Sequence, residues 1–485
     1  MAIFKSQPKA LSFLFLTELW ERFGFYVVQG MLVLYMTKSF GFSDEKSFTI
    51  LGMFTALAYI APMVGGFLAD AFLGFKSAIL WGGIFLIVGY ALLAVPGWDE
   101  GFYISLATII IGTGLFKPNI SSLLGALYGP HDSGRDAGFT IFYIGINMGI
   151  LLAGISSGAI KDYFGWHASF ALASVGLIIG LITFIIGLKW GEMKVKSSQP
   201  LKAYQSLFLR KPALFIYCIL AIGLVSLLLQ SSVLGDWLLP VFGIILIFFV
   251  FILATKQEPI FRKRLFMLNI LIISSIVFWM IYWQMFFSVN LFVDRLIDRT
   301  VFGFTIPTTA FYTLEALFII VLGTPMAMWW QRLSESNRNP SPLIKFIIAI
   351  ALVGLAFLVL TMSTFFQGST QLVNPLWIVV SYFLITLGEM LLSPIGLSAV
   401  TMLSPPHLTG MMMGVWFVAL GFGGQFAGLL AKLSSVEGAQ DLTVQLSTYR
   451  QAFLYYALLA FIVAGVLFVT QFFLKKIFGE KADII

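Results

Sequence analysis

Glu18-Leu-Trp-Glu21-Arg22-Phe23-Gly-Phe25-Tyr26-Val-Val-Gln29 places two carboxylates and a guanidinium inside an otherwise apolar segment near the start of the chain. At about 100° per residue, the charged side chains, Phe25 and Gln29 fall on one side of a helix, with Tyr26 at its edge. Each charge costs roughly 2.5–3.5 kcal/mol in a membrane helix, so the stripe predicts a water-filled cavity or a charged partner on another helix. The alternative is an ion pair that only joins helices, but one Arg cannot neutralise two Glu.

The composition of the whole chain is typical of a membrane protein with many transmembrane helices. Hydrophobic residues make up 59% and charged residues 11% of 485 residues, and the mean hydropathy is +0.97. These values lie far outside the range of soluble globular chains. We therefore expect an all-α polytopic membrane protein. Apolar stretches of about 20 residues predict fourteen transmembrane helices, at 11–37, 47–70, 76–95, 101–127, 136–160, 167–189, 212–231, 235–254, 265–289, 308–331, 343–366, 375–403, 409–433 and 449–474.

Lys and Arg indicate the orientation of these helices. Loops on the side of the N-terminus carry 20 of them and the opposite loops carry 7. By the positive-inside rule, both termini are cytoplasmic in the cell membrane, in contact with the lipid bilayer. The same distribution accounts for the net charge of +7 without a nucleic-acid partner, whose recognition requires a solvated basic face.

The densest basic segment also marks the domain organisation. Basic residues of 189–211 and 256–264 bracket a hydrophobic pair of helices, which looks like an insertion between two halves. We expect an N-terminal six-helix bundle at 1–190, linker segments with two inserted helices at 191–260, and a C-terminal six-helix bundle at 261–485. This 6+2+6 arrangement suggests a transporter whose site lies between the bundles near the bilayer midplane.

Further polar residues interrupt the apolar helices. Lys117 lies in mid-helix beside a helix-breaking proline, and its natural anionic partners are Glu18 and Glu21, although the side chain is long enough to snorkel to the membrane surface. Asn147 either hydrogen-bonds to another helix or binds a ligand. Glu315 and Glu389 lack a basic residue within their own helix turn, so each either titrates or meets a cationic ligand.

We expect no metal and no organic cofactor. Cys218 is the single cysteine, and the three histidines, which we interpret as surface residues, have no metal-ligand partner three or four positions away. A phosphate-binding Gly-x-x-x-x-Gly-Lys loop is also missing, which favours the proton gradient over a nucleotide as the energy source.

Several of these motifs together resemble one family, the proton-dependent oligopeptide transporters of the major facilitator superfamily, in its bacterial form. The first helix is similar to the motif Glu-x-x-Glu-Arg-Phe-x-Tyr-Tyr from Glu18 to Tyr26. The segment from Gly114 to Gly149 resembles the second hallmark of the family, and Gly388-Glu389 through Ser398 resembles the third. The Gly-rich stretch from Gly65 to Lys76 is similar to a loop of the wider superfamily. The resemblance covers essentially the whole chain.

The resemblance implies a fold and a set of roles. The fold is the major facilitator fold with two extra helices. Arg22 and Lys117 would bind the carboxylate of a small peptide, Glu389 and Asn147 would bind its amino group, and Glu18 and Glu21 would take part in proton coupling. The aromatic residues that would line the pocket are Tyr26, Tyr59 and Trp416.

The sequence also departs from the family at binding-site positions. Gln29 stands where the family commonly has a second Arg, Phe25 replaces a Tyr, and Trp283 stands where many members have a titrating Glu. Glu315 occupies a position where many members have an Asn. We hypothesise that the carboxylate of the C-terminal half has moved from the position of Trp283 to Glu315; the alternative is an adjusted pocket in which Glu315 has no coupling role.

The sequence as a whole therefore predicts a proton-coupled symporter, expected to be a monomer, that imports di- and tripeptides by alternating access. The alternative within transport is a relative that carries another small anion or zwitterion, such as nitrate, an amino acid or a peptide-like compound. A membrane enzyme is disfavoured because the helices contain no nucleophile with a base at helical spacing.

Overall fold

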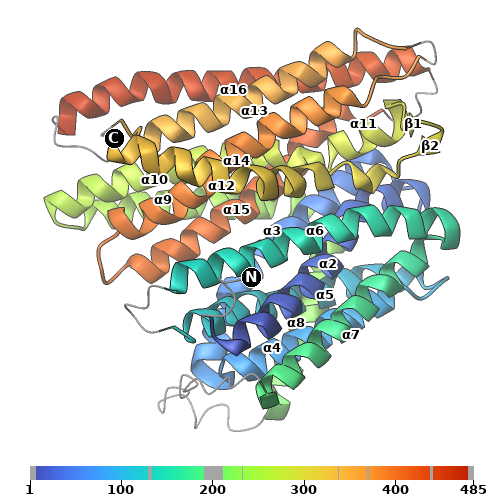
Figure 1. The fold of residues 1–485 in the computed structure, drawn as a ribbon, viewed down its shortest axis with the longest axis horizontal. Coiled ribbons are helices and arrows are strands. Elements are labelled where there is room, and N and C mark those ends of the chain that lie inside the picture. The colour runs from blue at the N-terminus through green and yellow to red at the C-terminus, as the bar shows by residue number, and fades with distance from the viewer. Residues whose placement is uncertain are drawn as a thin grey trace. The chain divides into compact units, whose positions relative to one another are not determined.

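The computed structural model describes residues 7–128, 134–190, 211–231, 233–336, 338–368, 371–436, 438 and 441–478. The chain forms two compact units, and in each of them long helices run roughly alongside one another (Figure 1). Unit 1 consists of Met1–Leu32 and Leu57–Ser231. Unit 2 consists of Val33–Ala56 and Ser232–Ile485.

Unit 1 is built from helices of the first half of the sequence. They are most of α2 (Lys9–Lys38), the C-terminal part of α3 (Asp44–Leu68) with a π-helical turn at Ala69–Leu73, α4 (Phe75–Leu93), a 3-10 turn at Asp99–Gly101, α5 (Phe102–Gly125), α6 (Arg135–Phe164), α7 (Trp166–Trp190) and α8 (Lys211–Gln230). Helix α4 packs against α5 and α7, and α8 packs against α5.

Unit 2 contains the second half of the sequence and the 33–56 segment, which comprises the C-terminal end of α2, the turn after it and the N-terminal half of α3. Its further elements are a π-helical turn at Leu234–Leu238, α9 (Leu239–Thr255), α10 (Pro259–Tyr282), a 3-10 turn at Trp283–Met285, α11 (Ser288–Leu296), β1 (Thr300–Val301), β2 (Phe304–Thr305), a 3-10 turn at Thr308–Ala310, α12 (Thr313–Glu335), α13 (Pro342–Ser363), α14 (Leu376–Leu403), α15 (Thr409–Ala431), a 3-10 turn at Lys432–Ser434 and α16 (Leu442–Phe478). Helix α13 packs against α14 and α16, and α10 packs against α15.

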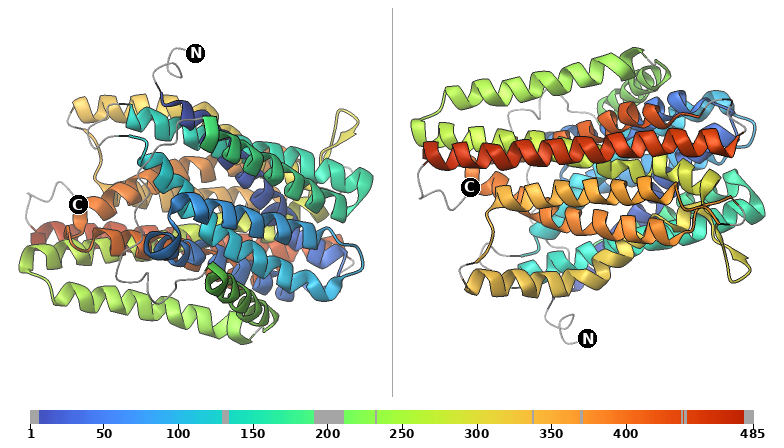
Figure 2. Two further views of the ribbon diagram at one scale, coloured as in Figure 1. Left: turned by 90° about the horizontal axis from the view of Figure 1, so that it is seen from below. Right: turned by 90° about the horizontal axis from the view of Figure 1, so that it is seen from above.

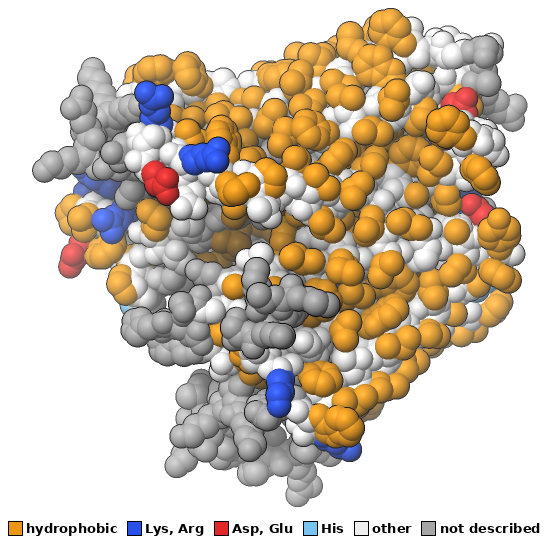
Figure 3. Space-filling view, in the orientation of Figure 1, with side chains coloured by type: hydrophobic (Ala, Val, Ile, Leu, Met, Phe, Trp, Pro, Cys, Tyr) orange, Lys and Arg blue, Asp and Glu red, His pale blue; other side chains and the backbone are white. Residues whose placement is uncertain are grey.

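The fourteen apolar helices that the sequence predicts are confirmed. Among the described residues, twelve helical segments are long and apolar enough to cross a membrane. Helix α2, which carries the charged stripe, and α8, whose apolar part is Phe215–Gln230, complete the fourteen. Helices are the form expected because lipid offers no partner to an unpaired backbone group. Hydrophobic side chains cover most of the described surface in Figure 3, and the charged side chains in view lie toward its margins.

One predicted helix is wrong in its extent. We expected a single helix at 265–289, but α10 ends at Tyr282 and α11 begins only at Ser288. Phe287 interrupts the helical path with φ −104° and ψ −105°. The side chain of Gln284 stabilises the break, because its Nε2 donates to the backbone oxygen of Ala427 at 2.9 Å and its Oε1 accepts from the Ser288 hydroxyl at 2.6 Å.

The sequence also gave no sign of the small β-hairpin β1–β2. Val301 pairs with Phe304 across a two-residue turn in which Phe302 and Gly303 both have positive φ, 52° and 81°. Turns of this kind favour Asn or Asp before Gly, so a Phe in that position hides the signal. Figure 2 shows the hairpin projecting beyond the neighbouring helix ends of unit 2.

The predicted division at 1–190, 191–260 and 261–485 follows membrane topology rather than packing, and it stays a prediction. Of its middle part, residues 191–210 lie outside the described residues.

Candidate functional site

The charged stripe of α2 is almost completely buried inside unit 1. Glu18, Glu21 and Arg22 are 1%, 0% and 2% exposed. Arg22 binds Glu21 through two atoms, with Nε at 2.5 Å from Oε2 and Nη2 at 2.6 Å from Oε1, and its Nε lies 3.5 Å from Glu18 Oε1. A two-point guanidinium–carboxylate pair is strong and fixes the orientation of both groups. The other oxygen of Glu18, Oε2, is buried without a hydrogen-bond partner.

Lys117 of α5 supplies the second positive charge of this cluster. Its ammonium lies 4.4 Å from the ring centre of Tyr59 on α3 and interacts electrostatically with Glu18 and Glu21. Two carboxylates are therefore balanced by two cations, which resolves the mismatch of two Glu against one Arg on α2. We call Glu18, Glu21, Arg22 and Lys117 the charged cluster. Bringing the two helices together is how the fold accommodates four ionisable groups in an apolar bundle.

Glycines allow the close helix crossings that build the cluster. A Cβ placed on Gly65 of α3 would lie 1.9 Å from the backbone oxygen of Gly114, one turn before Lys117 on α5. A Cβ on Gly149 of α6 would lie 2.5 Å from the backbone oxygen of Leu19 on α2. No larger residue fits at either crossing without moving backbone, so these glycines hold α3 and α6 against the helices that carry the charges.

The other binding residues predicted in unit 1 surround the same region of α2 or lie on α6. The Tyr26 ring packs edge-on against Phe25 at 5.5 Å, and Tyr26 interacts electrostatically with Arg22. Gln29 is fully buried. Asn147 is 2% exposed, and its Nδ2 donates to the backbone oxygen of Tyr143 in its own helix at 3.0 Å.

In unit 2 the structure brings together Glu315 of α12 and Glu389 of α14. The two carboxyl groups interact with each other, and both interact with the Tyr282 side chain at the end of α10. Glu315 is 4% exposed and Glu389 9%. Oε2 of Glu389 is buried without a hydrogen-bond partner, so this atom can accept a donor from a ligand.

Aromatic side chains pack around Tyr282, next to this acidic pair. Tyr282 packs edge-on against Trp279 at 4.9 Å and against Trp283 at 5.7 Å. Trp283 is 2% exposed and also contacts Phe286 at 5.7 Å. Trp283 therefore fills space with an apolar ring next to Tyr282, and the carboxyl groups of this region come from the two neighbouring helices.

Trp416 of α15 lies against α14, two helical turns from Glu389. A Cβ on Gly396 would lie 2.1 Å from the Trp416 ring, and Phe346 of α13 packs against the same ring at 6.3 Å. Trp416 is 2% exposed. Trp416 therefore lies beside Gly396 of α14, in the part of this helix that Pro394 loosens.

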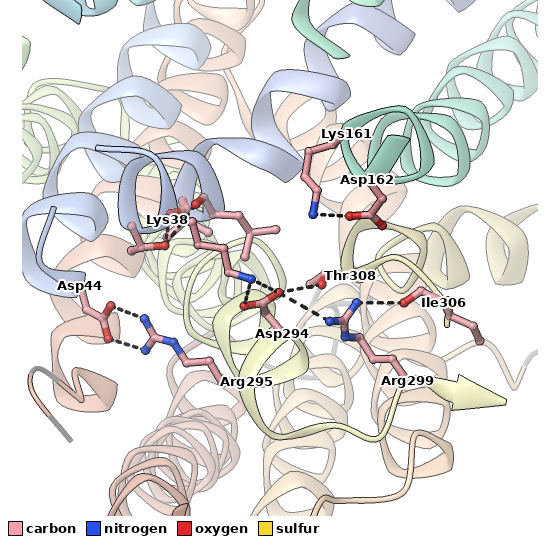
Figure 4. Close-up of polar contacts among 12 residues, drawn as sticks. Lys38, Asp44, Lys161, Asp162, Asp294, Arg295, Arg299, Ile306 and Thr308 are labelled. Atoms are coloured by element: carbon pink, nitrogen blue, oxygen red, sulfur yellow. Dashed lines mark hydrogen bonds and ion pairs between the residues drawn. The ribbon is translucent and has the colours of Figure 1, made fainter. Parts of the chain in front are cut away.

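Sequence reasoning missed a set of ion pairs between the 33–56 segment and α11. Asp44, 4% exposed, accepts hydrogen bonds from Arg295 Nη1 and Nη2, both at 2.7 Å, and from the backbone N–H of Val436 at 3.2 Å (Figure 4). Lys38 lies 2.6 Å from Asp294, and Thr308 donates to the same carboxylate at 3.1 Å. The adjacent charges at 294 and 295 are the only sequence signal of these pairs, and the charge count treats the basic residues as loop charges.

Sequence reasoning also missed an ion pair between Lys432 and Asp236, which holds the π-helical turn before α9. Lys432 Nζ lies 2.8 Å from Asp236 Oδ2, and Thr49 of the 33–56 segment donates to Asp236 Oδ1 at 3.2 Å. The amide of Gln425 donates to the backbone oxygen of Gly235 at 2.7 Å. Within the described residues, no group of three or more His, Cys, Asp and Glu side chains is arranged to hold a metal ion.

Comparisons with known proteins agree with the geometry. A model of the POT family matches residues 76–445. The peptide transporter YePEPT of Yersinia enterocolitica is 35% identical to this chain over 449 residues, 88% of each protein. Dipeptide and tripeptide permease A of Escherichia coli is 33% identical over 472 residues, which cover 96% of this chain and 92% of the permease. The crystal structure of a mutant of the peptide transporter POT in complex with alafosfalin matches with a TM-score of 0.82 and 32% identity over 95% of each chain.

Proposed function

Because the chain belongs to the POT family, and is thus a multi-pass membrane transporter of the major facilitator fold rather than an enzyme, we propose that it imports di- and tripeptides together with protons. The relatives named as dipeptide and tripeptide permease or as peptide transporter support the substrate class. The charged cluster supports proton coupling. Transport follows alternating access, driven by the proton-motive force.

The observation that carries this proposal is the balance of charge in the charged cluster. With Glu18 and Glu21 ionised, the two acids cancel Arg22 and Lys117. A proton bound to either acid leaves the cluster with one net positive charge in a low-dielectric site, where the attraction for a carboxylate is strong. The buried free oxygen of Glu18 is the place at which the proton binds. Protonation and binding of the peptide carboxylate therefore favour each other.

The amino group of the peptide is assigned to unit 2 and Asn147. Glu389 offers its unpartnered oxygen to the ammonium. Asn147 contributes its amide oxygen, and Tyr26, Tyr59 and Trp416 line the space for peptide side chains. Glu315 takes part in proton coupling in place of the acid that many members have at the position of Trp283.

One observation favours the second candidate, a transporter of another small anion or zwitterion. Gln29 is fully buried where the family commonly has an Arg, so one cation for the carboxylate is missing. Competition distinguishes the two candidates: excess di-alanine displaces a labelled dipeptide if peptides are the substrate, whereas nitrate or single amino acids displace it in the alternative.

The orientation and the oligomeric state complete the proposal. The excess of Lys and Arg in the loops on the N-terminal side supports cytoplasmic termini. We propose a monomer, because each unit contains its own set of predicted binding residues.

The test is uptake of labelled di-alanine into liposomes that hold the purified protein, with an inward proton gradient and a membrane potential. We expect accumulation that a protonophore abolishes. Lys117→Ala should abolish accumulation because the charged cluster then lacks the cation that receives the carboxylate. Lys161→Ala is the matched control, since Lys161 pairs with Asp162 2.5 Å away at the end of α6, and it should transport normally. Robust proton-driven accumulation by Lys117→Ala would contradict the proposal.

A further inference from the structure

A groove in unit 2 lies between the hairpin β1–β2 and the first turns of α12 and α14. Its volume is about 760 Å³, within the range of about 300–1,000 Å³ that is typical of small-ligand sites. Backbone hydrogen bonds tie its two loops together: the N–H of Val373 donates to Leu296 at 2.8 Å, and the N–H of Asp298 donates to Val373 at 2.9 Å. The groove is therefore a built part of the fold.

The helices and the loops contribute different side chains to this groove. Leu314 of α12 and Leu376 and Val379 of α14 lie in the first turns of their helices and are apolar. Asp298 and Asn374 lie in the loops and are polar. A bilayer changes in the same way, from hydrocarbon at the level of the helices to polar headgroups at the level of the loops. The lining therefore suits an amphiphile.

The apolar part of the groove continues into exposed apolar surface of the same two helices. Leu317 and Val321 of α12 and Val380 of α14 are all exposed. In a multi-pass membrane protein, lipid chains cover such a surface. At the same end of unit 2, the rings of Phe366 and Trp377 stack at 5.7 Å, and aromatic residues of this kind are typical of the membrane–water interface. A membrane lipid can therefore reach the groove directly from the bilayer.

The charge in the groove indicates which lipid it takes. Among the described residues that line it, Asp298 is the only charged one, and it forms no ion pair within the described part of the chain. Its neighbour Arg299 instead lies 4.0 Å from Asp294 and donates to the backbone oxygen of Ile306 at 3.1 Å (Figure 4). Oδ1 of Asp298 accepts the backbone N–H of Thr300 at 3.1 Å, which leaves most of the acceptor capacity of the carboxylate open. This charge favours a cationic headgroup and disfavours an anionic one.

The hairpin lines the groove with a side chain that is unfavourable in water. Phe302 is 97% exposed, and its φ of 52° is a left-handed conformation that is costly for a residue with a Cβ. Phe304, the second Phe of the hairpin, is exposed as well. Contact with a lipid in the groove would remove the apolar area of the Phe302 ring from water and offset the strain of the turn.

We propose that this groove binds one phospholipid whose headgroup carries an ammonium, as in phosphatidylethanolamine. The ammonium lies at Asp298, one acyl chain lies against Leu314 and Val379, and the Phe302 ring covers the lipid from the hairpin. Phosphatidylglycerol with the same acyl chains has no cation for Asp298 and should bind more weakly. The inference is independent of the proposed function, because no residue of the groove belongs to the charged cluster or is assigned to peptide binding.

The test is native mass spectrometry of the purified full-length protein, incubated with phosphatidylethanolamine or phosphatidylglycerol of the same acyl chains. We expect one retained molecule of phosphatidylethanolamine, bound at least about tenfold more tightly than phosphatidylglycerol, the typical value of a hydrogen bond to a charged group. Asp298→Asn should remove this preference. Asp441→Asn is the matched control and should keep it, because Asp441 also accepts a backbone N–H two residues later, that of Thr443 at 2.8 Å, but lies outside the groove.

Two further substitutions test the apolar part of the groove. Val379→Trp fills the groove and should abolish retention of both lipids, whereas Val380→Trp adds the same ring at the next, exposed position outside the groove and should retain them. Phe302→Asn removes the ring and keeps the turn, because Asn tolerates positive φ. It should weaken retention of both lipids by about fivefold. A monodisperse elution peak and an unchanged melting temperature in detergent show that each variant is folded.

Equal retention of the two lipids by the unsubstituted protein overturns the proposal, as does a preference that survives in Asp298→Asn or is lost equally in Asp441→Asn. Retention that Val379→Trp leaves unchanged also overturns it. The same spectra reveal whether the exposed hairpin contacts a second copy of this chain instead: a dimer that Phe302→Asn dissociates, without retained lipid, rules out the lipid site. Peptide uptake is measured separately, so the lipid site and the proposed function can each fail alone.

Discussion

Breaking the ion pair between Asp44 and Arg295 should open the end of the protein at which the 33–56 segment contacts α11. Helices α2 and α3 belong mainly to unit 1, yet this segment packs within unit 2. We expect this contact to break in part of a transport cycle that works by alternating access. Asp44→Asn removes the charge from a 4% exposed side chain and keeps its shape. It weakens two hydrogen bonds from a guanidinium that is 25% exposed.

The magnitude follows from the geometry. Hydrogen bonds to charged groups contribute about 1.5–3 kcal/mol when buried, and discounting for the exposure of Arg295 gives about 2 kcal/mol for the pair. This corresponds to a population of the open state about 30-fold larger. The pair of Lys38 with Asp294 is the internal control: the Lys38 side chain is 45% exposed and Thr308 still binds Asp294, so Lys38→Gln should change the population by less than about fivefold.

Cysteine labelling measures this population. Ser47 is fully buried in the 33–56 segment, and Cys218 is the single native cysteine. In a Cys218→Ser background, the rate at which a membrane-impermeant maleimide labels Ser47→Cys reports how often this end opens. Asp44→Asn, Arg295→Gln and the double variant form a thermodynamic cycle. A coupling near zero, or labelling that Asp44→Asn leaves unchanged, would refute the reasoning.

Two other predictions concern packing and orientation. Gly65→Ala should prevent accumulation of folded protein, because its Cβ would lie 1.9 Å from the backbone oxygen of Gly114. Gly323→Ala in α12 is the control and should be tolerated, since a Cβ there meets nothing within 4 Å. The yield of each variant is measured by fluorescence size-exclusion chromatography, and equal yields would show that the α3–α5 crossing can relax. Green fluorescent protein fused to either terminus should fluoresce in whole cells, because it folds only in the cytoplasm and both termini are proposed to lie there. If these fusions do not fluoresce and alkaline phosphatase fused to the same terminus is active, the proposed orientation is wrong.

The sequence predicted the helices well because lipid imposes a simple rule on each of them. A span needs about 20 apolar residues, so its ends can be read from where the apolar run stops. The range 375–403 differs by one residue from α14, Leu376–Leu403. The rule fails at Trp283–Phe287, where the run stays apolar and aromatic but the helix breaks. That break depends on Gln284 reaching a backbone oxygen of α15, a contact between residues more than 140 positions apart.

The same distinction separates the two halves of the candidate site. The stripe from Glu18 to Gln29 lies on one helix, so helical spacing alone placed its members on one face, and the need for charge balance pointed to Lys117. Glu315 and Glu389 lie on different helices, and spacing within a helix says nothing about which faces meet. Sequence reasoning therefore treated them as two separate unpaired acids. Tyr282, which connects them, was one aromatic residue among many in a segment of Phe and Trp.

The basic residues of the loops opposite the N-terminus show that a charge can be both a topology signal and part of a structural contact. Seven Lys and Arg run against the positive-inside count, and five of them form ion pairs in the folded units: Lys38, Lys161, Arg295, Arg299 and Lys432. The other two are also engaged, Lys46 over the Phe42 ring at 3.5 Å and Arg450 with Thr364 at 3.0 Å. The positive-inside rule depends on the large excess of basic residues in the loops on the N-terminal side, so a few basic residues in the opposite loops do not change the predicted orientation. These basic residues occur at positions where the fold uses them, and the pairs of Lys38 and Arg295 join the 33–56 segment to α11.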